Sequence, residues 1–329
     1  MTGVVQGVGF RPFVYQLARE QDLAGWVLND GGGVEIEAEG EAPALAAFAT
    51  ALGERLPALA RVEQVEEELR PCRGEEGFRI RASAAAGERS AAIPADAALC
   101  PACRAELLDP ADRRHRYPFI NCTLCGPRLT IVEETPYDRA RTTMRRFPLC
   151  PACAAEYGDP SDRRFHAEPV ACPACGPGLS WRGKRGEEAA GEAALAAALS
   201  LLARGGILAL KGLGGFHLAC RADDEAAVAE LRRRKERPCK PFAVMVAGAG
   251  ELAELAELSP AEVRLATGPE SPITLLRKKA GAPLAPGVAP GVGEIGVMTA
   301  YTPLHLLLFR SGLAFPALVM TSGNRRDEP

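Results

Sequence analysis

Cys150-Pro-Ala-Cys153 and Cys172-Pro-Ala-Cys175 are two cysteine pairs separated by eighteen residues, and together they copy an earlier stretch of the same sequence. In that earlier stretch, Cys100-Pro-Ala-Cys103 precedes Cys122-Thr-Leu-Cys125 at the same spacing. Eight of the eleven cysteines therefore fall into four Cys-x-x-Cys pairs. Two thiolates of one such pair can reach a single tetrahedral ion, and a long connection can bring a second pair opposite. The repeat predicts two structural zinc sites with four cysteine ligands each.

A disulfide framework or a redox-active pair is the alternative to metal. The N-terminus has no basic segment leading into an apolar one, so we expect a cytoplasmic, reducing environment, where repeated cysteine spacing favours zinc. Four thiolates close the coordination shell, so His115 and His166 are not expected to be ligands. The sequence leaves open whether each zinc binds neighbouring pairs or pairs exchanged between the two repeats.

Length, composition and charge limit the classes of protein to which the chain can belong. The chain has 329 residues, 47% of them hydrophobic, and a formal net charge of −3. These values are typical of soluble domains. No apolar run is long enough to cross a bilayer. The charge gives no general attraction to nucleic acid. Linker-like stretches near 82–98 and 176–191 predict three regions, and the boundaries follow from them: residues 1–82, 94–182 and 190–329.

The first region begins with a glycine-rich loop at 3–11 that leads into an amphipathic helix. Backbone N–H groups of such a loop can converge on an anion, and Arg11 can add a bidentate contact. Two strands around residues 25–29 and 34–39 and a further helix follow. The motifs Gly-Val-Val-Gln-Gly-Val-Gly-Phe-Arg and Gly-Trp-Val-Leu-Asn resemble those of the acylphosphatase family.

That resemblance implies a ferredoxin-like domain that hydrolyses an acyl phosphate. Arg11 would bind the phosphate and Asn29 would orient the attacking water. The family has a strand before the loop, but only two residues precede Gly3 here. We therefore expect the first strand to be missing and the sheet to have an unpaired edge.

In the second region, Asp-Pro-x-Asp-Arg-Arg recurs between the cysteine pairs, and its arginines are Arg113, Arg114, Arg163 and Arg164. These side chains could contact a nucleic-acid backbone, or they could balance the charge of the zinc thiolates. We favour charge balance because the arginines alternate with aspartates.

The third region alternates helices and strands and predicts an α/β domain. Three cations at the entrance of a strand suit a triphosphate, namely Lys235, Arg237 and Lys240. The run Lys-x-Arg-x-x-Lys-Pro and the segment Thr-Ser-Gly-Asn at 321–324 resemble the YrdC-like nucleotide-binding family. This resemblance implies ATP, with Mg²⁺, as a substrate, and adds three nucleotide contacts, at Lys211, Ser322 and Asn324.

Taken in order, the three regions form a multidomain α+β chain that resembles the HypF carbamoyltransferases of nickel–iron hydrogenase maturation. The resemblance implies that carbamoyl phosphate is hydrolysed, that the carbamate is adenylated with ATP, and that a HypE-type acceptor protein receives the carbamoyl group. It also implies that the end of the YrdC-like part and a C-terminal transfer domain are missing. The alternatives are a zinc-containing RNA-binding or tRNA-modification protein of the YrdC type, and an inactive scaffold.

Overall fold

The computed structural model describes residues 1–84, 92–312 and 315–324 and divides the chain into two compact units. Unit 1 consists of Met1–Asp96 and Asn121–Gly176, and unit 2 of Ala97–Ile120 and Pro177–Pro329. The predicted linker over residues 82–98 lies partly outside the described residues. The boundaries of the units thus cut through the predicted cysteine region, whose second repeat lies in unit 1.

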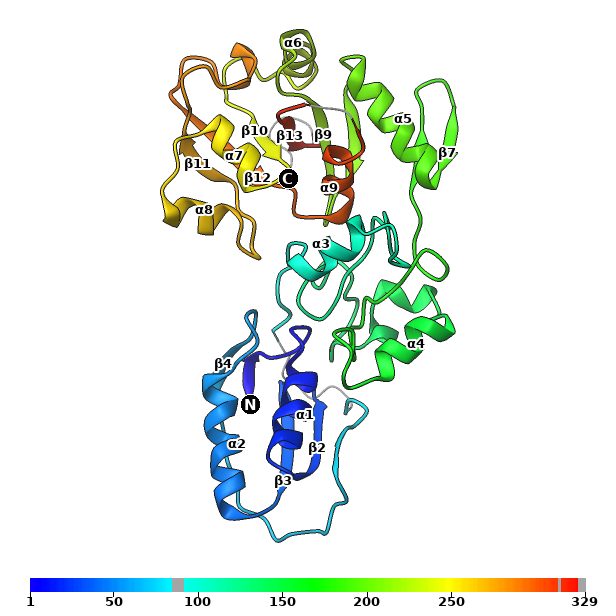
Figure 1. Ribbon diagram of the computed structural model, residues 1–329, viewed down its shortest axis with the longest axis vertical. Coiled ribbons are helices and arrows are strands. Elements are labelled where there is room, and N and C mark those ends of the chain that lie inside the picture. Colours follow the sequence, from blue (N-terminus) through cyan, green and yellow to red (C-terminus); the bar gives the residue numbers. More distant parts are fainter. Residues whose placement is uncertain (85–91, 313–314, 325–329) are drawn as a thin grey trace. The chain divides into compact units, whose positions relative to one another are not determined.

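The N-terminal part of unit 1 has alternating strands and helices (Figure 1). In chain order they are β1 (Thr2–Val4), α1 (Phe10–Glu20), β2 (Ala24–Asn29), β3 (Val34–Glu39), α2 (Ala42–Glu54), β4 (Arg61–Gln64) and β5 (Phe78–Ile80). Strand β2 pairs antiparallel with β3 and parallel with β5, and β1 pairs antiparallel with β4. This order of elements is the one expected for a ferredoxin-like domain.

One core joins these helices and strands. Phe10, Val14 and Leu17 recur at helical spacing along α1 and are buried. They pack with Val27 of β2 and Phe48 of α2. The apolar stripe of each helix thus faces the sheet, as the 3.6-residue period requires.

The expected absence of a first strand is corrected by β1, which is short but present. Gly3 and Val4 pair with β4, and the backbone N–H of Val34 donates to Met1 O at 3.0 Å. The N-terminal ammonium donates back to Val34 O at 2.9 Å. Backbone pairing by these few residues reaches β4 and the first residue of β3, but β1-β4 and β3-β2-β5 remain separate sheets, so the edge of β3 beyond Val34 has no strand partner among the described residues, as expected.

The rest of unit 1 has little regular structure. It contains two short 3₁₀ helices (Arg139–Arg141 and Thr143–Arg146) and α4 (Pro151–Gly158), which begins within the third cysteine pair. Buried apolar residues are sparse in this segment, in keeping with a fold organised around metal.

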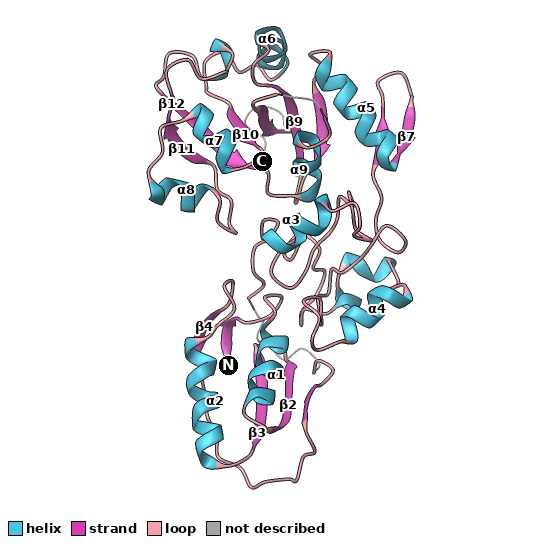
Figure 2. Ribbon diagram, viewed as in Figure 1, coloured by secondary structure: helices cyan, strands magenta, loops and turns pink. Residues whose placement is uncertain are grey.

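Unit 2 is built on a six-stranded mixed sheet with the order β11-β12-β10-β13-β9-β8 (Figure 2). Its strands are β8 (Leu208–Lys211), β9 (Phe216–Arg221), β10 (Ala243–Val246), β11 (Thr274–Arg277), β12 (Glu294–Thr299) and β13 (Leu318–Ser322). Only β10 and β12 are parallel neighbours, and the other pairs are antiparallel. The sheet confirms the α/β class expected for the third region.

Helices cover this sheet. They are α5 (Gly191–Ala203), α6 (Glu225–Arg234), α7 (Ala249–Leu255), α8 (Pro260–Ala266) and α9 (Pro303–Phe309), and a hairpin of β6 (Ser180–Arg182) and β7 (Glu188–Ala190) precedes α5. Helix α3 (Pro101–Leu108) also belongs to unit 2 but lies in the first cysteine repeat. Val244, Val297 and Val319 from three central strands share a core with Leu231 of α6 and Leu252 of α7. The continuous apolar runs of the central strands fit their burial on both faces.

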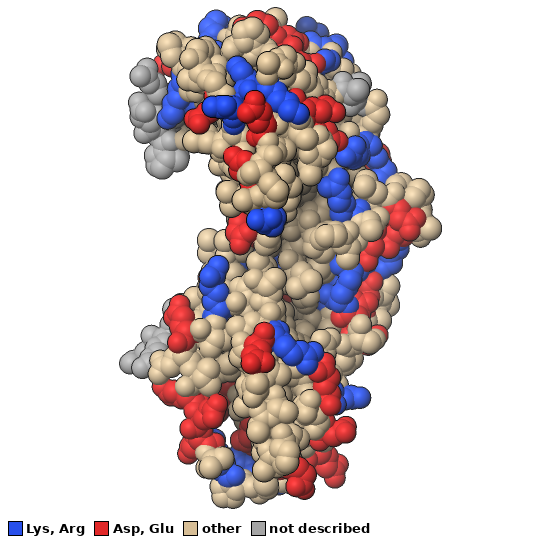
Figure 3. All heavy atoms as spheres, turned by 60° about the vertical axis from the view of Figure 1, so that its left-hand side comes forward, with Lys and Arg blue, Asp and Glu red and all other residues tan. Residues whose placement is uncertain are grey.

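The surface is mixed in charge. On the face drawn in Figure 3, Lys and Arg side chains are interspersed with Asp and Glu. Among the residues that the structure describes, none of the helices combines the length and the apolar character that crossing a membrane requires.

Candidate functional site

The glycine-rich loop of unit 1 ends at the start of α1 in a left-handed turn. Gly7 and Gly9 have φ angles of 69° and 74°, which side chains rarely adopt, so glycine is needed at both positions. Gln6 fixes the other end of the loop, because its Nε2 donates to the backbone oxygens of Asp30 and Gly33 at 2.8 and 2.7 Å. The loop is thus held against the turn that follows β2, and Arg11 is placed in the first turn of α1.

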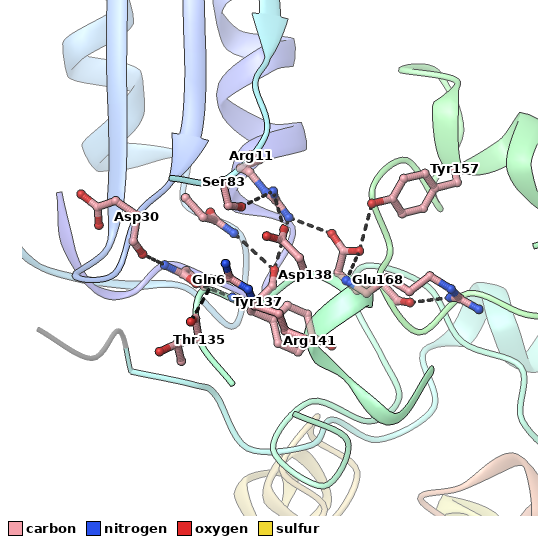
Figure 4. Close-up of polar contacts among 12 residues, drawn as sticks. Gln6, Arg11, Asp30, Ser83, Thr135, Tyr137, Asp138, Arg141, Tyr157 and Glu168 are labelled. Atoms are coloured by element: carbon pink, nitrogen blue, oxygen red, sulfur yellow. Dashed lines mark hydrogen bonds and ion pairs between the residues drawn. The ribbon is translucent and has the colours of Figure 1, made fainter. Parts of the chain in front are cut away.

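Arg11 is 7% exposed and points into a cluster of oxygen atoms (Figure 4). Its Nη2 lies 2.8 Å from Glu168 Oε1, and its Nη1 lies 3.0 Å from Asp138 Oδ1. Ser83 Oγ accepts a weaker contact at 3.4 Å. Burial alone would lower the pKa of Arg11, but the Glu168 and Asp138 carboxylates outweigh it and raise the pKa above its usual value. The guanidinium is therefore always charged.

Asn29 lies at the end of β2 in the same pocket and is 1% exposed. Its Nδ2 is 3.4 Å from Tyr137 O, and its Oδ1 has no hydrogen-bond partner among the described residues. A buried carbonyl oxygen without a partner costs free energy unless a water or ligand donates to it. The pocket therefore combines a fixed cation with a vacant acceptor, contributed by the two residues that the sequence analysis singled out.

Glu168 and Asp138 are site residues that the sequence analysis missed. Glu168 is 2% exposed, and its Oε2 accepts from Tyr157 Oη and from the backbone N–H of Arg139, both at 2.9 Å. Burial raises the pKa of Glu168 above its usual value, and Arg11 opposes that rise. One signal was present in the sequence: counted from the first cysteine of each repeat, Glu168 corresponds to Pro118, so the copies differ there.

The eight cysteines form two clusters of four. One consists of Cys100, Cys103, Cys122 and Cys125, and the other of Cys150, Cys153, Cys172 and Cys175. Within each cluster the sulfur atoms lie within 4.8 Å of one another. Neighbouring pairs therefore share a cluster, which resolves the alternative that the sequence left open.

Sulfur spacing in these clusters fits zinc. Sulfurs about 2.3 Å from a tetrahedral ion lie roughly 3.8 Å apart. Cys150 Sγ is 3.7 Å from Cys172 Sγ, and Cys175 Sγ is 3.7 Å from Cys153 Sγ. In the first cluster, Cys122 Sγ and Cys125 Sγ are 3.8 Å apart. All four ligand positions are filled by thiols, so a zinc ion bound in either cluster would have no open position for substrate, and neither cluster includes a histidine.

In unit 2, three of the predicted nucleotide contacts meet. Lys235 Nζ donates to Ser322 O at 2.8 Å and to Asn324 O at 2.7 Å. Lys211 ends β8, where it pairs with Phe216, and the N–H of Gly323 donates to Phe216 O at 2.7 Å. The ends of β8, β9 and β13 thus bring Lys211 near the group formed by Lys235, Ser322 and Asn324.

The other two predicted contacts lie in the loop before β10. Lys240 is exposed, and Arg237 Nε donates to Lys240 O at 3.1 Å. Arg237 also lies over the Phe242 ring, with 5.1 Å between its guanidinium carbon and the ring centroid. Arg237 therefore uses part of its hydrogen-bond donors within its own loop.

His305 of α9, His217 of β9 and Tyr301 form a cluster of aromatic rings in unit 2. His305 is fully buried, stacks on His217 at 5.7 Å and meets Tyr301 edge-on at 4.7 Å. Neither ring nitrogen of His305 has a hydrogen-bond partner among the described residues. Burial lowers the pKa of His305 to about 3, and nearby His217 adds to the effect.

Comparison with protein-family models divides the chain in three. Residues 1–80 match the acylphosphatase model, residues 99–132 and 149–182 match the HypF finger model, and residues 200–329 match a model of Sua5, YciO and YrdC proteins described as telomere recombination. An acylphosphatase from Salinibacter ruber is 46% identical over 83 residues, which is 86% of its length.

Longer relatives cover the whole chain. Carbamoyltransferase HypF2 of Cupriavidus necator and carbamoyltransferase HypF of a Synechocystis species are each 52% identical over 99% of this chain, which spans 42% of their length. A crystal structure of full-length HypF in the phosphate- and nucleotide-bound form matches with a TM-score of 0.91 and 44% identity, covering 100% of this chain and 42% of that one. Across the part of these proteins that it spans, the chain belongs to the HypF carbamoyltransferase family.

Proposed function

We propose that this chain performs two chemical steps of carbamoyl transfer in hydrogenase maturation. In the first step, the pocket of Arg11 and Asn29 hydrolyses carbamoyl phosphate to carbamate and phosphate. The observation that carries this proposal is that a buried, always charged guanidinium and an unpartnered amide oxygen line one pocket. The match of residues 1–80 to acylphosphatases supports it.

The residues present suit this reaction. An acyl phosphate is an activated compound, so its hydrolysis needs binding, orientation and charge stabilisation rather than a protein nucleophile. Arg11 neutralises the phosphate and the charge that develops on it. Asn29 Oδ1 accepts a hydrogen bond from the attacking water and orients it. Backbone N–H groups of the glycine-rich loop supply further donors to the phosphate oxygens.

In the second step, unit 2 joins the carbamate to ATP, giving carbamoyl adenylate and pyrophosphate. Lys211, Lys235 and Lys240 would neutralise the triphosphate together with Mg²⁺, and Ser322 and Asn324 would contact the nucleotide. The HypF structure that matches this chain is in a phosphate- and nucleotide-bound form, which supports both substrate classes. The carbamoyl group would then pass to the C-terminal cysteine of a HypE-type acceptor.

Phosphate release tests the first step. We expect the zinc-loaded chain to release phosphate from carbamoyl phosphate, and Arg11→Lys and Asn29→Ala each to lower kcat/KM by about 100-fold or more. Lysine keeps the charge but not the planar fork of donors. Arg19→Lys is the matched control, because Arg19 is exposed near the end of the same helix. Unchanged rates in the two pocket variants would refute the proposal.

Two of the four arginines of the repeat do not support the alternative of an RNA-binding protein. Arg114 and Arg164 are 1% and 3% exposed, and Arg164 Nε donates to Asn121 O at 3.1 Å. Side chains buried in this way cannot reach a phosphate backbone. The interspersed charges in Figure 3 point the same way, because binding to nucleic acid favours a continuous basic surface.

A further inference from the structure

Glu168 presents one carboxylate oxygen to the pocket and has the other fixed. Oε2 is held by two donors, Tyr157 Oη and the N–H of Arg139. Oε1 faces Arg11 at 2.8 Å (Figure 4). Since the side chain is 2% exposed and doubly anchored, Oε1 is a hydrogen-bond acceptor at a set position.

A buried carboxylate is unexpected in a pocket that binds only phosphate. Two like charges in contact repel, so Glu168 lowers the affinity for any phosphate held by Arg11. The other pocket oxygens are acceptors as well, namely Asn29 Oδ1 and the backbone oxygen of Tyr137. An acceptor-rich wall next to a phosphate site matches a substrate that has N–H donors beside its phosphate.

Asp138 and Glu168 differ in a way that lets substrate enter. The Asp138 side chain is 26% exposed, so it can be solvated by water when it leaves Arg11 Nη1. Glu168 is closed off from water and keeps its contact with Nη2. Arg11 can therefore turn Nη1 to the phosphate while Glu168 remains in place.

We propose that Glu168 determines the specificity of this site for carbamoyl phosphate by accepting a hydrogen bond from the substrate's NH₂ group. The inference rests on the proposed hydrolysis of carbamoyl phosphate. Acetyl phosphate has a methyl group where carbamoyl phosphate has NH₂, so it leaves Oε1 without that donor. Sites built to bind an N–H group discriminate strongly against analogues that lack it, and here the lone pair of Oε1 that Arg11 does not use would be left without a donor.

Glu168→Gln tests the proposal because it removes the charge and replaces one of the two acceptor oxygens with a donor. Tyr157 Oη and the Arg139 N–H approach the position of Oε2, and Arg11 Nη2 approaches that of Oε1, so either orientation of the amide sets its NH₂ against a donor. In both orientations the pocket loses acceptor strength toward a substrate N–H group. The readout is the ratio of kcat/KM for carbamoyl phosphate to that for acetyl phosphate, which a general change in phosphate affinity leaves unchanged.

We expect the unaltered chain to favour carbamoyl phosphate and Glu168→Gln to lower the ratio by about tenfold or more. Glu134→Gln is the matched control, because Glu134 is exposed in the same unit. Tyr157→Phe removes one anchor, keeps the ring and should lower the ratio to a smaller extent. This variant provides the test if Glu168→Gln does not fold, as judged by circular dichroism and zinc content.

The possible results distinguish a failure of the proposed hydrolysis from a failure of the proposed role of Glu168. If the unaltered chain hydrolyses neither compound, the proposed function fails and the inference falls with it. If it hydrolyses both but shows no preference, or if folded Glu168→Gln or Tyr157→Phe keeps the original ratio, the hydrolysis stands and Glu168 is not the specificity residue.

Discussion

Arg11 and Glu168 lie 157 residues apart in the sequence, yet their charged groups are 2.8 Å apart and their side chains are 8% and 2% exposed. Removing two charges from water is costly, and only mutual attraction and further hydrogen bonds offset that cost. Here Tyr157 and Asp138 supply those additional contacts. The pair therefore ties α1 to the second cysteine repeat within unit 1.

Removing one charge of this pair should lower the free energy of unfolding more than removing both charges. We expect Arg11→Met to lower the free energy of unfolding by about 3 kcal/mol, because Glu168 is left buried without its cation. Adding Glu168→Gln to Arg11→Met should restore part of the loss while hydrolysis stays absent. Urea unfolding of the single and double variants at saturating zinc measures the coupling. Strictly additive losses would show that the two charges do not stabilise each other.

Zinc stoichiometry tests the two clusters separately. Cys153→Ser should lower bound zinc from two ions per chain to one, because a closed shell of four thiolates tolerates no missing ligand well. Elemental analysis after gel filtration measures this directly. Cys72→Ser is the control, since Cys72 is exposed and belongs to neither cluster. Two bound ions in Cys153→Ser would contradict the assignment.

Lys235 is the residue on which the nucleotide site can be tested most cleanly. Its Nζ donates to the backbone oxygens of Ser322, at the end of β13, and of Asn324, two residues further on. Lys235 is partly buried. Lys235→Met should weaken ATP binding by about tenfold, because a charge-assisted contact to phosphate is lost. Calorimetric titration with MgATP measures the Kd. Lys184→Met, at the exposed turn between β6 and β7, should leave the Kd unchanged.

Local pattern was enough to predict most elements of the fold. Glycine punctuation and apolar spacing gave β2 and β3 close to their observed bounds and a helix where α1 lies, and cysteine spacing predicted two clusters. These features depend on neighbours in sequence, so the chain shows them directly. The presence of β1 was not predicted, because pairing with a distant strand, β4, decides whether three residues form a strand.

The missed site residues depended on contacts that no local pattern contains. Arg11 and Asn29 belong to recognisable motifs, whereas Asp138 and Glu168 reach Arg11 across 127 and 157 residues. Arg232 stands in a run of three arginines at the end of α6, and a charge run of this kind predicts a solvated helix face. Arg233 and Arg234 do pair with exposed Glu230, but Arg232 turns inward. Which member of a charge run faces the protein depends on the loop packed against it.

Arg232 should therefore matter for the loop that contains Lys240. Its guanidinium lies 4.6 Å from the Phe242 ring centroid. It donates to four backbone oxygens, those of Arg237, Lys240, Gly287 and Val288. Lysine cannot serve several acceptors in one plane or stack as well, so Arg232→Lys should lower the free energy of unfolding by roughly 1–3 kcal/mol and weaken ATP binding.

The matched control for Arg232 is its exposed neighbour. Arg234→Lys keeps the charge and changes only a surface ion pair with Glu230, so it should alter stability by less than about 1 kcal/mol. Urea unfolding and MgATP titration of both variants decide the question. Equal effects at the two positions would show that the inward contacts of Arg232 contribute nothing.

His305 should make the folded state sensitive to acid. Burial lowers its pKa from 6.5 to about 3, so the folded chain keeps the ring neutral while the unfolded chain takes up a proton below about pH 6.5. Stability is therefore fully present above pH 6.5 and falls as the pH drops toward 3. His305→Phe keeps the contacts with His217 and Tyr301 but cannot be protonated. Relative to this variant, the unaltered chain should lose about 1.4 kcal/mol per pH unit below pH 6. Urea unfolding of both proteins between pH 8 and 5 measures the difference, from which acid release of zinc cancels. Parallel curves would show that His305 takes up its proton as readily when folded as when unfolded.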